Sequence, residues 1–246
     1  MMNIKELFSK VSKKITDYFF NPNWRCLNCG KEVFEEQEFC DECLQILPYN
    51  DGAICDHCGR KLNVFSNYCS TCKGKLVDLD KCRSAFNYLP PISKLIKQAK
   101  YDNAKYLLDY FAKRLSSLYF QNYFNADYLV YVPMSVRAEK RRGYNQSKLL
   151  AQKLSELIGV DVLDCLIKTK ETERQATLTG EQRRKNLVDA FKVIDKKSVK
   201  DKSILIVDDV TTTGATAQII AQKLKNAGAI KVYLITVASV PPFDKY

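Results

Sequence analysis

The stretch that decides the fold reads Ile204-Leu-Ile-Val-Asp-Asp-Val-Thr-Thr-Thr-Gly-Ala-Thr216. Four apolar residues predict a buried parallel strand, and Asp208 and Asp209 stand at its carboxyl end, where open α/β sheets bind ligands. The chain then turns through hydroxyl residues and Gly214 into a helix, whose first amides and dipole favour an anion. No Gly-Lys-Ser/Thr follows, which excludes a Walker A loop. The stretch therefore predicts a phosphate site at a strand-to-helix turn.

Strand and helix patterns alternate from about residue 83 onward, which predicts a parallel sheet with helices on its faces. The first predicted unit has a strand over 128–132, a basic loop over 134–143, a helix over 145–158 and a strand over 160–167. The second has a strand over 204–207, a Thr-rich turn, a helix and a strand over 230–238. Between the two units, residues 168–186 are polar and weakly periodic, which predicts a mobile loop leading into a short helix.

An internal repeat precedes this region. Cysteines at positions 26, 29, 40 and 43 recur 29 residues later at positions 55, 58, 69 and 72. Two Cys-x-x-Cys turns supply the four thiolates of a tetrahedral zinc site, so the repeat predicts two structural zinc ions. Either each copy holds its own ion, or the copies exchange pairs. The predicted ligands are Cys26, Cys29, Cys40, Cys43, Cys55, Cys58, Cys69 and Cys72.

One histidine and two further cysteines are not predicted to bind zinc. His57 lies between two predicted ligands, and we expect it to be exposed rather than ligating. Cys82 and Cys165 fall outside the repeat, and we expect buried, reduced thiols there.

The composition is that of a soluble globular chain, because 46% of the 246 residues are hydrophobic and 27% are charged. Ten cysteines are too few for a disulfide scaffold, which favours a reducing cytoplasm. The longest nearly unbroken apolar stretch, over 232–240, is about half the length that a membrane-spanning helix needs. We therefore expect a cytoplasmic protein without a transmembrane segment.

Positive charge is concentrated in the second part of the chain. Residues 1–80 hold 10 basic and 12 acidic side chains, whereas residues 81–246 hold 29 basic and 16 acidic ones, a net charge of +13. Such a surface attracts phosphates on nucleic acid, on a small ligand or on an anionic lipid surface, and charge alone does not choose among them.

These patterns divide the chain into three segments. Residues 1–22 predict an amphipathic basic helix, which either packs on the next domain or lies on a membrane surface or a partner. Residues 23–80 predict a double zinc ribbon, and residues 81–246 predict the α/β domain.

The thirteen residues of the opening stretch resemble the motif by which type I phosphoribosyltransferases bind 5-phosphoribosyl 1-pyrophosphate (PRPP). The resemblance implies a parallel-sheet α/β fold of that type, with Asp208 and Asp209 on the ribose hydroxyls and magnesium accompanying the pyrophosphate. It also implies that the following loop holds the 5-phosphate through Val210, Thr211, Thr212, Thr213, Gly214, Ala215 and Thr216.

Further motifs narrow the resemblance, over residues 20–240, to the ComF family of competence-associated proteins. They follow the cysteine-rich front as Ile96-Lys-Gln-Ala-Lys-Tyr101, Val132-Pro-Met-Ser-Val-Arg137, Arg142-Gly-Tyr-Asn-Gln146, Arg174-Gln175 and Arg183-Arg-Lys-Asn186. The resemblance implies a pyrophosphate loop with Ser135, Arg137, Arg141 and Arg142, and a lid with Lys168, Lys170, Arg174 and Gln175.

The family resemblance implies handling of single-stranded DNA during natural transformation, with a competence helicase as partner and peripheral contact at the inner face of the membrane. Aromatic residues available for base stacking are Tyr101, Tyr106, Tyr144 and Phe191, of which we expect most to lie in the core. The alternatives are a working phosphoribosyltransferase with an unknown acceptor and a non-catalytic adaptor. Catalytic residues stay unassigned. We do not expect a glutamine amidotransferase, because the chain begins Met1-Met2-Asn3 rather than with a nucleophile domain.

Overall fold

The computed structural model describes residues 25–34, 37–62, 66–69, 72–73, 78–170 and 189–241. It divides into two compact units, Met1–Leu47 and Pro48–Tyr246. The division falls between the two cysteine modules, so the second module shares a unit with the α/β region. The predicted helix over 1–22 lies outside the described residues, as does most of the loop predicted over 168–186.

The first unit contains a small cysteine module. An antiparallel bridge joins Arg25 to Glu32, and a short helix, α2 (Asp41–Gln45), follows. The N–H group of Gly30 donates to Cys26 O at 2.9 Å, and Gly30 adopts a φ of +75°, which favours a residue without a Cβ atom. These contacts close a tight turn around the first Cys-x-x-Cys pair.

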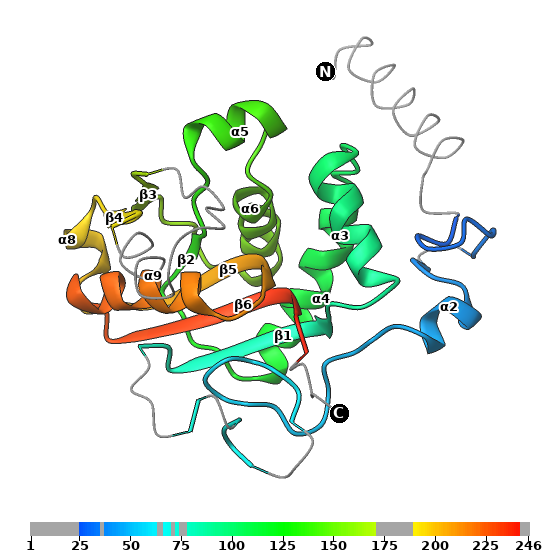
Figure 1. Ribbon diagram of the computed structural model, residues 1–246, viewed down its shortest axis with the longest axis horizontal. Helices are drawn as coiled ribbons and strands as arrows, with labels where there is room; N and C mark the ends of the chain where they lie inside the picture. The colour runs from blue at the N-terminus through cyan, green and yellow to red at the C-terminus, as the bar shows by residue number, and fades with distance from the viewer. Residues whose placement is uncertain are drawn as a thin grey trace, which may run out of the picture. The chain divides into compact units, whose positions relative to one another are not determined.

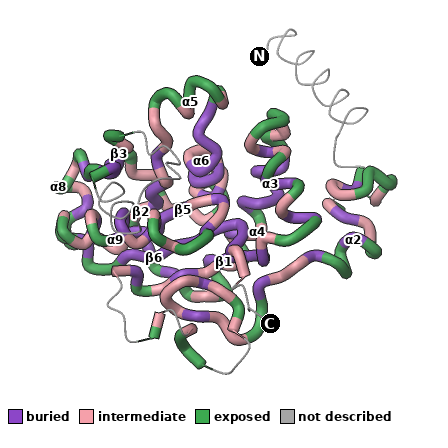
Figure 2. Tube along the Cα trace, in the orientation of Figure 1, coloured by how far each residue is buried: buried purple, intermediate pink, exposed green. Residues whose placement is uncertain are grey.

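The second unit contains the predicted parallel sheet (Figure 1). Its strands are β1 (Lys81–Asn87), β2 (Tyr128–Tyr131), β5 (Ser203–Thr211) and β6 (Lys231–Ser239). They lie in the order β1-β6-β5-β2, and every neighbouring pair is parallel. Near-continuous apolar sequence suits such strands because helices cover both faces, and Figure 2 shows that β5 and β6 are largely buried.

Helices form a layer on each side of the sheet. Two of them, α4 (Leu107–Gln121) and α6 (Gln146–Ile158), pack on one face, and α9 (Ala215–Asn226) packs on the other (Figure 1). A shorter helix, α3 (Ile92–Tyr101), packs against α4. The predicted helix over 145–158 is confirmed, with Asn145 as its N-cap and Gly159 as its left-handed C-cap.

Two local predictions were wrong. The expected basic loop over 134–143 is mostly a helix, α5 (Val136–Arg142). Ser135 caps its first turn by accepting from Ala138 N, and Gly143 ends it in the left-handed conformation. No side chain of α5 is buried, so the sequence lacks the apolar periodicity from which a helix is predicted.

The second wrong prediction is the strand over 160–167. Only Val162 pairs with the sheet, through a parallel bridge to Leu129. The chain then forms β3 (Leu166–Lys168), which pairs antiparallel with β4 (Phe191–Val193), and α8 (Lys196–Val199) follows. Exposed Asp161 and Asp164 interrupt the apolar run, which limits pairing with β2.

The free edge of β1 is covered by the segment that leads into the second cysteine module. Asn50 N donates to Ala85 O at 3.1 Å, Asn87 N donates to Pro48 O at 2.7 Å, and Cys82 N donates to Asp56 O at 2.8 Å. Unpaired backbone groups on an edge strand invite pairing with other chains. This segment satisfies those groups and joins the second module to the sheet.

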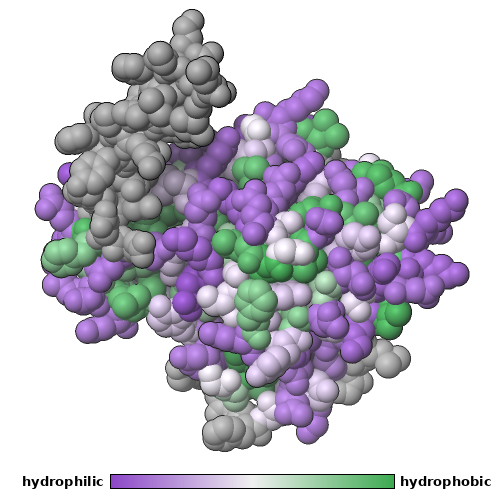
Figure 3. Space-filling view, turned by 180° about the vertical axis from the view of Figure 1, so that it is seen from behind, coloured by the Kyte–Doolittle hydropathy of each residue, from purple (hydrophilic) through white to green (hydrophobic). Residues whose placement is uncertain are grey.

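The surface on the side seen in Figure 3 is largely hydrophilic, with hydrophobic side chains in small groups. Among the described residues, every helix is too short or too polar to cross a membrane.

Candidate phosphate site and cysteine clusters

The opening stretch of sequence folds as predicted into a strand, a turn and a helix. Strand β5 continues past both carboxylates to Thr211, and α9 begins at Ala215. Gly214 precedes the helix with a φ of +77°, a backbone conformation that residues with a Cβ atom rarely adopt. The turn therefore presents the start of α9, whose first N–H groups have no partner within the helix, at the carboxyl edge of the sheet.

A cavity of about 50 Å³ lies at this turn. Asp208 and the predicted phosphate loop, residues 210–216, line it together with Ala217, Leu234 and Thr236. Asp209 is not among the lining residues. Adjacent side chains of a strand point to opposite sides, so the two carboxylates have different surroundings.

Asp209 forms an ion pair with Lys100 at the end of α3. Lys100 Nζ lies 2.5 Å from Asp209 Oδ2, and both side chains are largely buried. The pair fastens α3 to the carboxyl end of β5. Burial makes such a pair costly to break, because either partner alone would be an uncompensated charge.

Asp208 has a neutral partner. Ser147 Oγ donates to Asp208 Oδ1 at 2.7 Å, and the N–H group of Asp209 donates to the same oxygen at 2.9 Å. Burial, with a smaller contribution from the adjacent charge of Asp209, raises the pKa of Asp208 to about 7, although the hydrogen bond from Ser147 acts in the opposite direction. The carboxyl group of Asp208 therefore titrates near neutral pH.

The predicted pyrophosphate loop follows β2 and the predicted phosphate loop follows β5, so both begin at the same edge of the sheet, because β2 and β5 are parallel neighbours. A second cavity, of about 430 Å³, is lined by Ser135, Val136, Arg137, Lys140, Lys168, Thr169 and Lys170. The structure thus brings two predicted loop residues and two predicted lid residues to one basic pocket.

The remaining residues of these two groups lie elsewhere. Arg141 is exposed and does not line the pocket. Arg142 donates to Gln146, and its guanidinium lies 5.1 Å from the ring centroid of Tyr101 on α3. Arg174 and Gln175 lie outside the described residues.

Of the four candidate stacking residues, two are exposed and two are buried. Tyr101 is 71% exposed and Tyr106 is 50% exposed. Tyr144 and Phe191 are buried, so half of the four lie in the core rather than most of them, and the Tyr144 hydroxyl donates to Ala99 O. Tyr101 and Tyr106 are therefore the two of this set that can contact a ligand.

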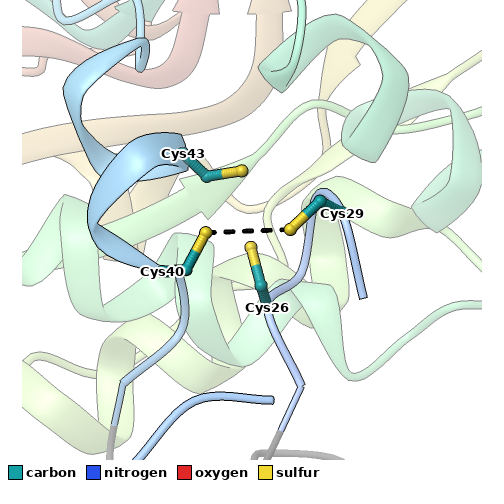
Figure 4. Close-up of side chains that lie close together, drawn as sticks. All are labelled: Cys26, Cys29, Cys40 and Cys43. Atoms are coloured by element: carbon teal, nitrogen blue, oxygen red, sulfur yellow. Dashed lines mark hydrogen bonds between the residues drawn. The ribbon is translucent and has the colours of Figure 1, made fainter. Parts of the chain in front are cut away.

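The cysteines of the first module gather around one point (Figure 4). The sulfur atoms of Cys29 and Cys40 are 3.7 Å apart. Four thiolates at about 2.3 Å from a tetrahedral zinc ion stand about 3.8 Å from one another, so this group fits zinc. Its members are Cys26, Cys29, Cys40 and Cys43.

The second module has the same arrangement. The sulfur atoms of Cys58 and Cys69 are 3.8 Å apart. Hydrogen bonding with Cys58 lowers the pKa of Cys55 to about 4, which favours a thiolate, the form that binds metal. Each copy thus gathers its own four thiols, rather than exchanging pairs with the other copy. The group consists of Cys55, Cys58, Cys69 and Cys72.

The residues around the repeat partly match expectation. His57 is outside the cluster of ligand atoms, but it is half-buried rather than exposed, because its ring packs at a tilt against Tyr68, with 4.2 Å between the ring centroids. Cys82 and Cys165 are buried free thiols, as predicted, and burial raises the pKa of Cys165 to about 12.

Sequence reasoning missed three residues that contact the phosphate site. They are Lys100, which pairs with Asp209, Ser147, which donates to Asp208, and Arg60, which donates to Thr212 O. Lys100 lies within one of the motifs that resemble the ComF family, and this motif was the sequence feature that could have identified it. No local pattern marks the other two.

Two family models match parts of this chain. A family model described as a double zinc ribbon domain matches residues 15–77, and one described as a phosphoribosyl transferase domain matches residues 136–242. Among solved structures, a glutamine PRPP amidotransferase from B. subtilis is 20% identical, with a TM-score of 0.39 over 53% of this chain and 26% of that one. A purine phosphoribosyltransferase from Pyrococcus horikoshii is 16% identical, with a TM-score of 0.34 over 57% of this chain and 91% of that one.

Curated relatives match most of the chain. Competence protein F of Haemophilus influenzae is 30% identical over 222 residues, which are 85% of this chain and 94% of the relative. DNA utilization protein YhgH of Escherichia coli K12 is 32% identical, over 74% of this chain and 82% of the relative. Competence protein ComFC of Bacillus subtilis is 26% identical, over 83% of this chain and 84% of the relative. With a double zinc ribbon followed by a phosphoribosyltransferase-type sheet, and with this identity to competence protein F, the chain belongs to the ComF family.

Proposed function

We propose that this protein handles single-stranded DNA during natural transformation and binds PRPP, or another 5-phosphoribosyl ligand, at the turn after β5. The observation that carries the proposal is the cavity in which Asp208 and the phosphate loop meet at the start of α9. The names of the relatives, a competence protein and a DNA utilization protein, support the DNA-related part. We further propose a cytoplasmic location.

The phosphoribosyl ligand would use the groups already described. The amides and hydroxyls of residues 210–216 suit the 5-phosphate, and the carboxylates of Asp208 and Asp209 suit the ribose hydroxyls. The basic pocket that Arg137, Lys140, Lys168 and Lys170 line suits the pyrophosphate. Magnesium would enter with the ligand and offset part of the pyrophosphate charge.

Single-stranded DNA would use a surface that contains exposed aromatic rings and basic side chains. Tyr101 is 71% exposed with the Arg142 guanidinium 5.1 Å from its ring centroid, and Tyr106, five residues further along the chain, is 50% exposed. Exposed aromatic rings stack bases, and nearby basic side chains bind phosphates. The net charge of +13 on residues 81–246 favours the same partner.

A binding assay with matched variants tests the DNA proposal. Fluorescence anisotropy with a labelled oligo(dT) should give an affinity that falls steeply as salt rises, because counterions are released from several phosphates. Tyr101→Ala should weaken binding about tenfold, in line with the loss of one stacked base. Tyr123→Ala is the control, because Tyr123 is 90% exposed at the far end of α4. A flat salt response, or equal effects of both substitutions, would contradict the proposal.

The alternative is a working phosphoribosyltransferase that transfers ribose 5-phosphate to an unidentified nitrogen acceptor. The basic pocket favours it, because cationic side chains there would stabilise the leaving pyrophosphate without a covalent nucleophile. A screen of nucleobases and amines with PRPP, followed by pyrophosphate release, tests this alternative. Release that depends on an acceptor and is lost in Arg137→Ala would support turnover.

Two further partners rest on the sequence alone. We propose that the double zinc ribbon supports the structure or docks a competence helicase, and that residues 1–22 contact the inner face of the membrane. Deletion of residues 1–22 should release the protein from sedimented membranes, and unchanged sedimentation would contradict the membrane contact.

A further inference from the structure

The second cysteine module contacts the phosphate loop through one side chain. Arg60 stands two residues after Cys58, and its Nη2 donates to the backbone oxygen of Thr212. Thr212 belongs to the loop that lines the cavity after β5. Arg60 itself does not line that cavity, so its effect on a ligand there would pass through the backbone of Thr212.

The backbone beside Arg60 is fixed against the sheet. Asp56 accepts from the backbone N–H group of Cys82 and, through Oδ1, from Arg83 Nη2, each at 2.8 Å. Asn50 Nδ2 donates to Gly59 O at 2.6 Å. Gly59 packs so closely on the sheet that an added Cβ atom would lie 2.8 Å from Cys82 Sγ. The residue that precedes Arg60 therefore has little freedom to move relative to β1.

A second contact joins the chain after this module to α9. The N–H group of Asp78 donates to Gln218 Oε1 at 3.1 Å, and Gln218 lies in the first turn of that helix. Arg60 and Asp78 thus contact the two elements that form the phosphate site, the loop and the helix that follows it.

The contact with the Thr212 carbonyl also sets the direction of the next N–H group, because both groups belong to one peptide bond. The carbonyl of Thr212 and the N–H group of Thr213 belong to one planar trans peptide and point in opposite directions. Because Arg60 holds that carbonyl, the N–H group of Thr213 is directed away from Arg60. Backbone N–H groups at such a turn are the donors that an anion requires, and they bind it best when their direction is fixed in advance.

We infer that Arg60 is a positioning residue for the phosphate loop, so that the second cysteine module, when it holds zinc, helps to set the affinity for PRPP. This inference rests on the proposed PRPP site. It assigns the two modules different roles, because Lys31, the counterpart of Arg60 in the repeat, pairs instead with Glu42 at 2.6 Å within the first unit.

The repeat supplies a matched pair of variants, Arg60→Met and Lys31→Met, which remove the donor and keep most of the side-chain length. Both are made in the full, zinc-loaded chain. We expect Arg60→Met to weaken PRPP binding about tenfold in calorimetry with magnesium, the range for loss of one charged hydrogen bond. Lys31→Met should change it less than twofold. The NMR order parameter of the Thr213 backbone amide should fall only in Arg60→Met, and each variant should retain two zinc ions.

Unchanged PRPP affinity together with an unchanged order parameter at Thr213 in Arg60→Met would overturn the inference. If Arg60→Met loses zinc, Arg60→Lys decides, because it retains a charged donor and should bind PRPP within about threefold of the unmodified protein. A loss of affinity as large in Arg60→Lys would overturn the positioning role. If the unmodified protein binds no PRPP, the proposed function fails, and the order parameter of the Thr213 amide still decides whether Arg60 orders the loop.

Discussion

Lys100 Nζ lies 2.5 Å from Asp209 Oδ2, which joins the last turn of α3 to the carboxyl end of β5. Asp208, the preceding residue of the strand, has the hydroxyl of Ser147 as its partner instead. One carboxylate of the pair is thus matched to a cation and the other to a neutral donor. This difference makes the two aspartates distinguishable by experiment, although they are adjacent in sequence.

Removal of one member of the Lys100–Asp209 pair should destabilise the fold. We expect Lys100→Met to lower the free energy of unfolding by about 3 kcal/mol, because Asp209 would remain buried without a cation. Lys100→Met combined with Asp209→Asn should cost less than the two single changes added together. Urea denaturation of the single and double variants measures this coupling.

Lys153→Met is the control for that cycle. Lys153 pairs with Asp109, whose side chain is 56% exposed, and surface pairs contribute at most about 1 kcal/mol. Additive effects in the Lys100 and Asp209 variants would mean that the buried pair is not coupled.

Asp208→Asn should stabilise the protein in a pH-dependent way. The pKa of Asp208 is raised to about 7, chiefly by burial, so the folded state binds a proton that the unfolded state releases near pH 4. The stability of the unmodified protein should therefore fall, relative to the variant, as pH rises toward 7, and then level off. Asparagine keeps the acceptor for Ser147 and stays neutral. Thermal unfolding of both proteins between pH 5.5 and 8 should show a Tm difference that grows with pH; a constant difference would contradict the raised pKa.

Zinc content in paired cysteine variants should reveal the ligand sets. We expect two zinc ions per chain in the unmodified protein and one in Cys29→Ser/Cys40→Ser, because both substitutions fall in one cluster. Cys29→Ser/Cys58→Ser should retain none, because each cluster loses a ligand. Exchange of pairs between the modules would instead leave none in the first variant and one in the second. Mass spectrometry under native conditions distinguishes these outcomes.

The central strand, the phosphate turn and helix α6 could be predicted because their signals are local. A run of apolar residues before Asp208 marks β5, and Asn145 and Gly159 mark the ends of α6. The repeat likewise indicated the thiol ligands, and the structure added which four gather in each cluster. Helix α5 was missed because none of its side chains is buried, so its sequence has no apolar periodicity. Its caps, Ser135 and Gly143, are residue types that commonly cap helices and could have been recognised.

The contacts that organise the site could not be predicted in this way. Ser147 and Asp208 are 61 residues apart, and Arg60 and Thr212 are 152 residues apart. Such pairs form only because the sheet order and the covering of β1 bring distant segments together. Hydrogen bonds of this kind leave no periodicity in the sequence around either partner.

Calorimetric titration with PRPP and magnesium tests the central claim most directly, in the zinc-loaded protein and in Asp208→Asn/Asp209→Asn. The account predicts saturable binding to the unmodified protein and at least a hundredfold loss in the double variant, because the two carboxylates proposed to accept the ribose hydroxyls are gone. Thermal unfolding should show that the double variant remains folded. PRPP binding of equal affinity in both proteins would contradict the site.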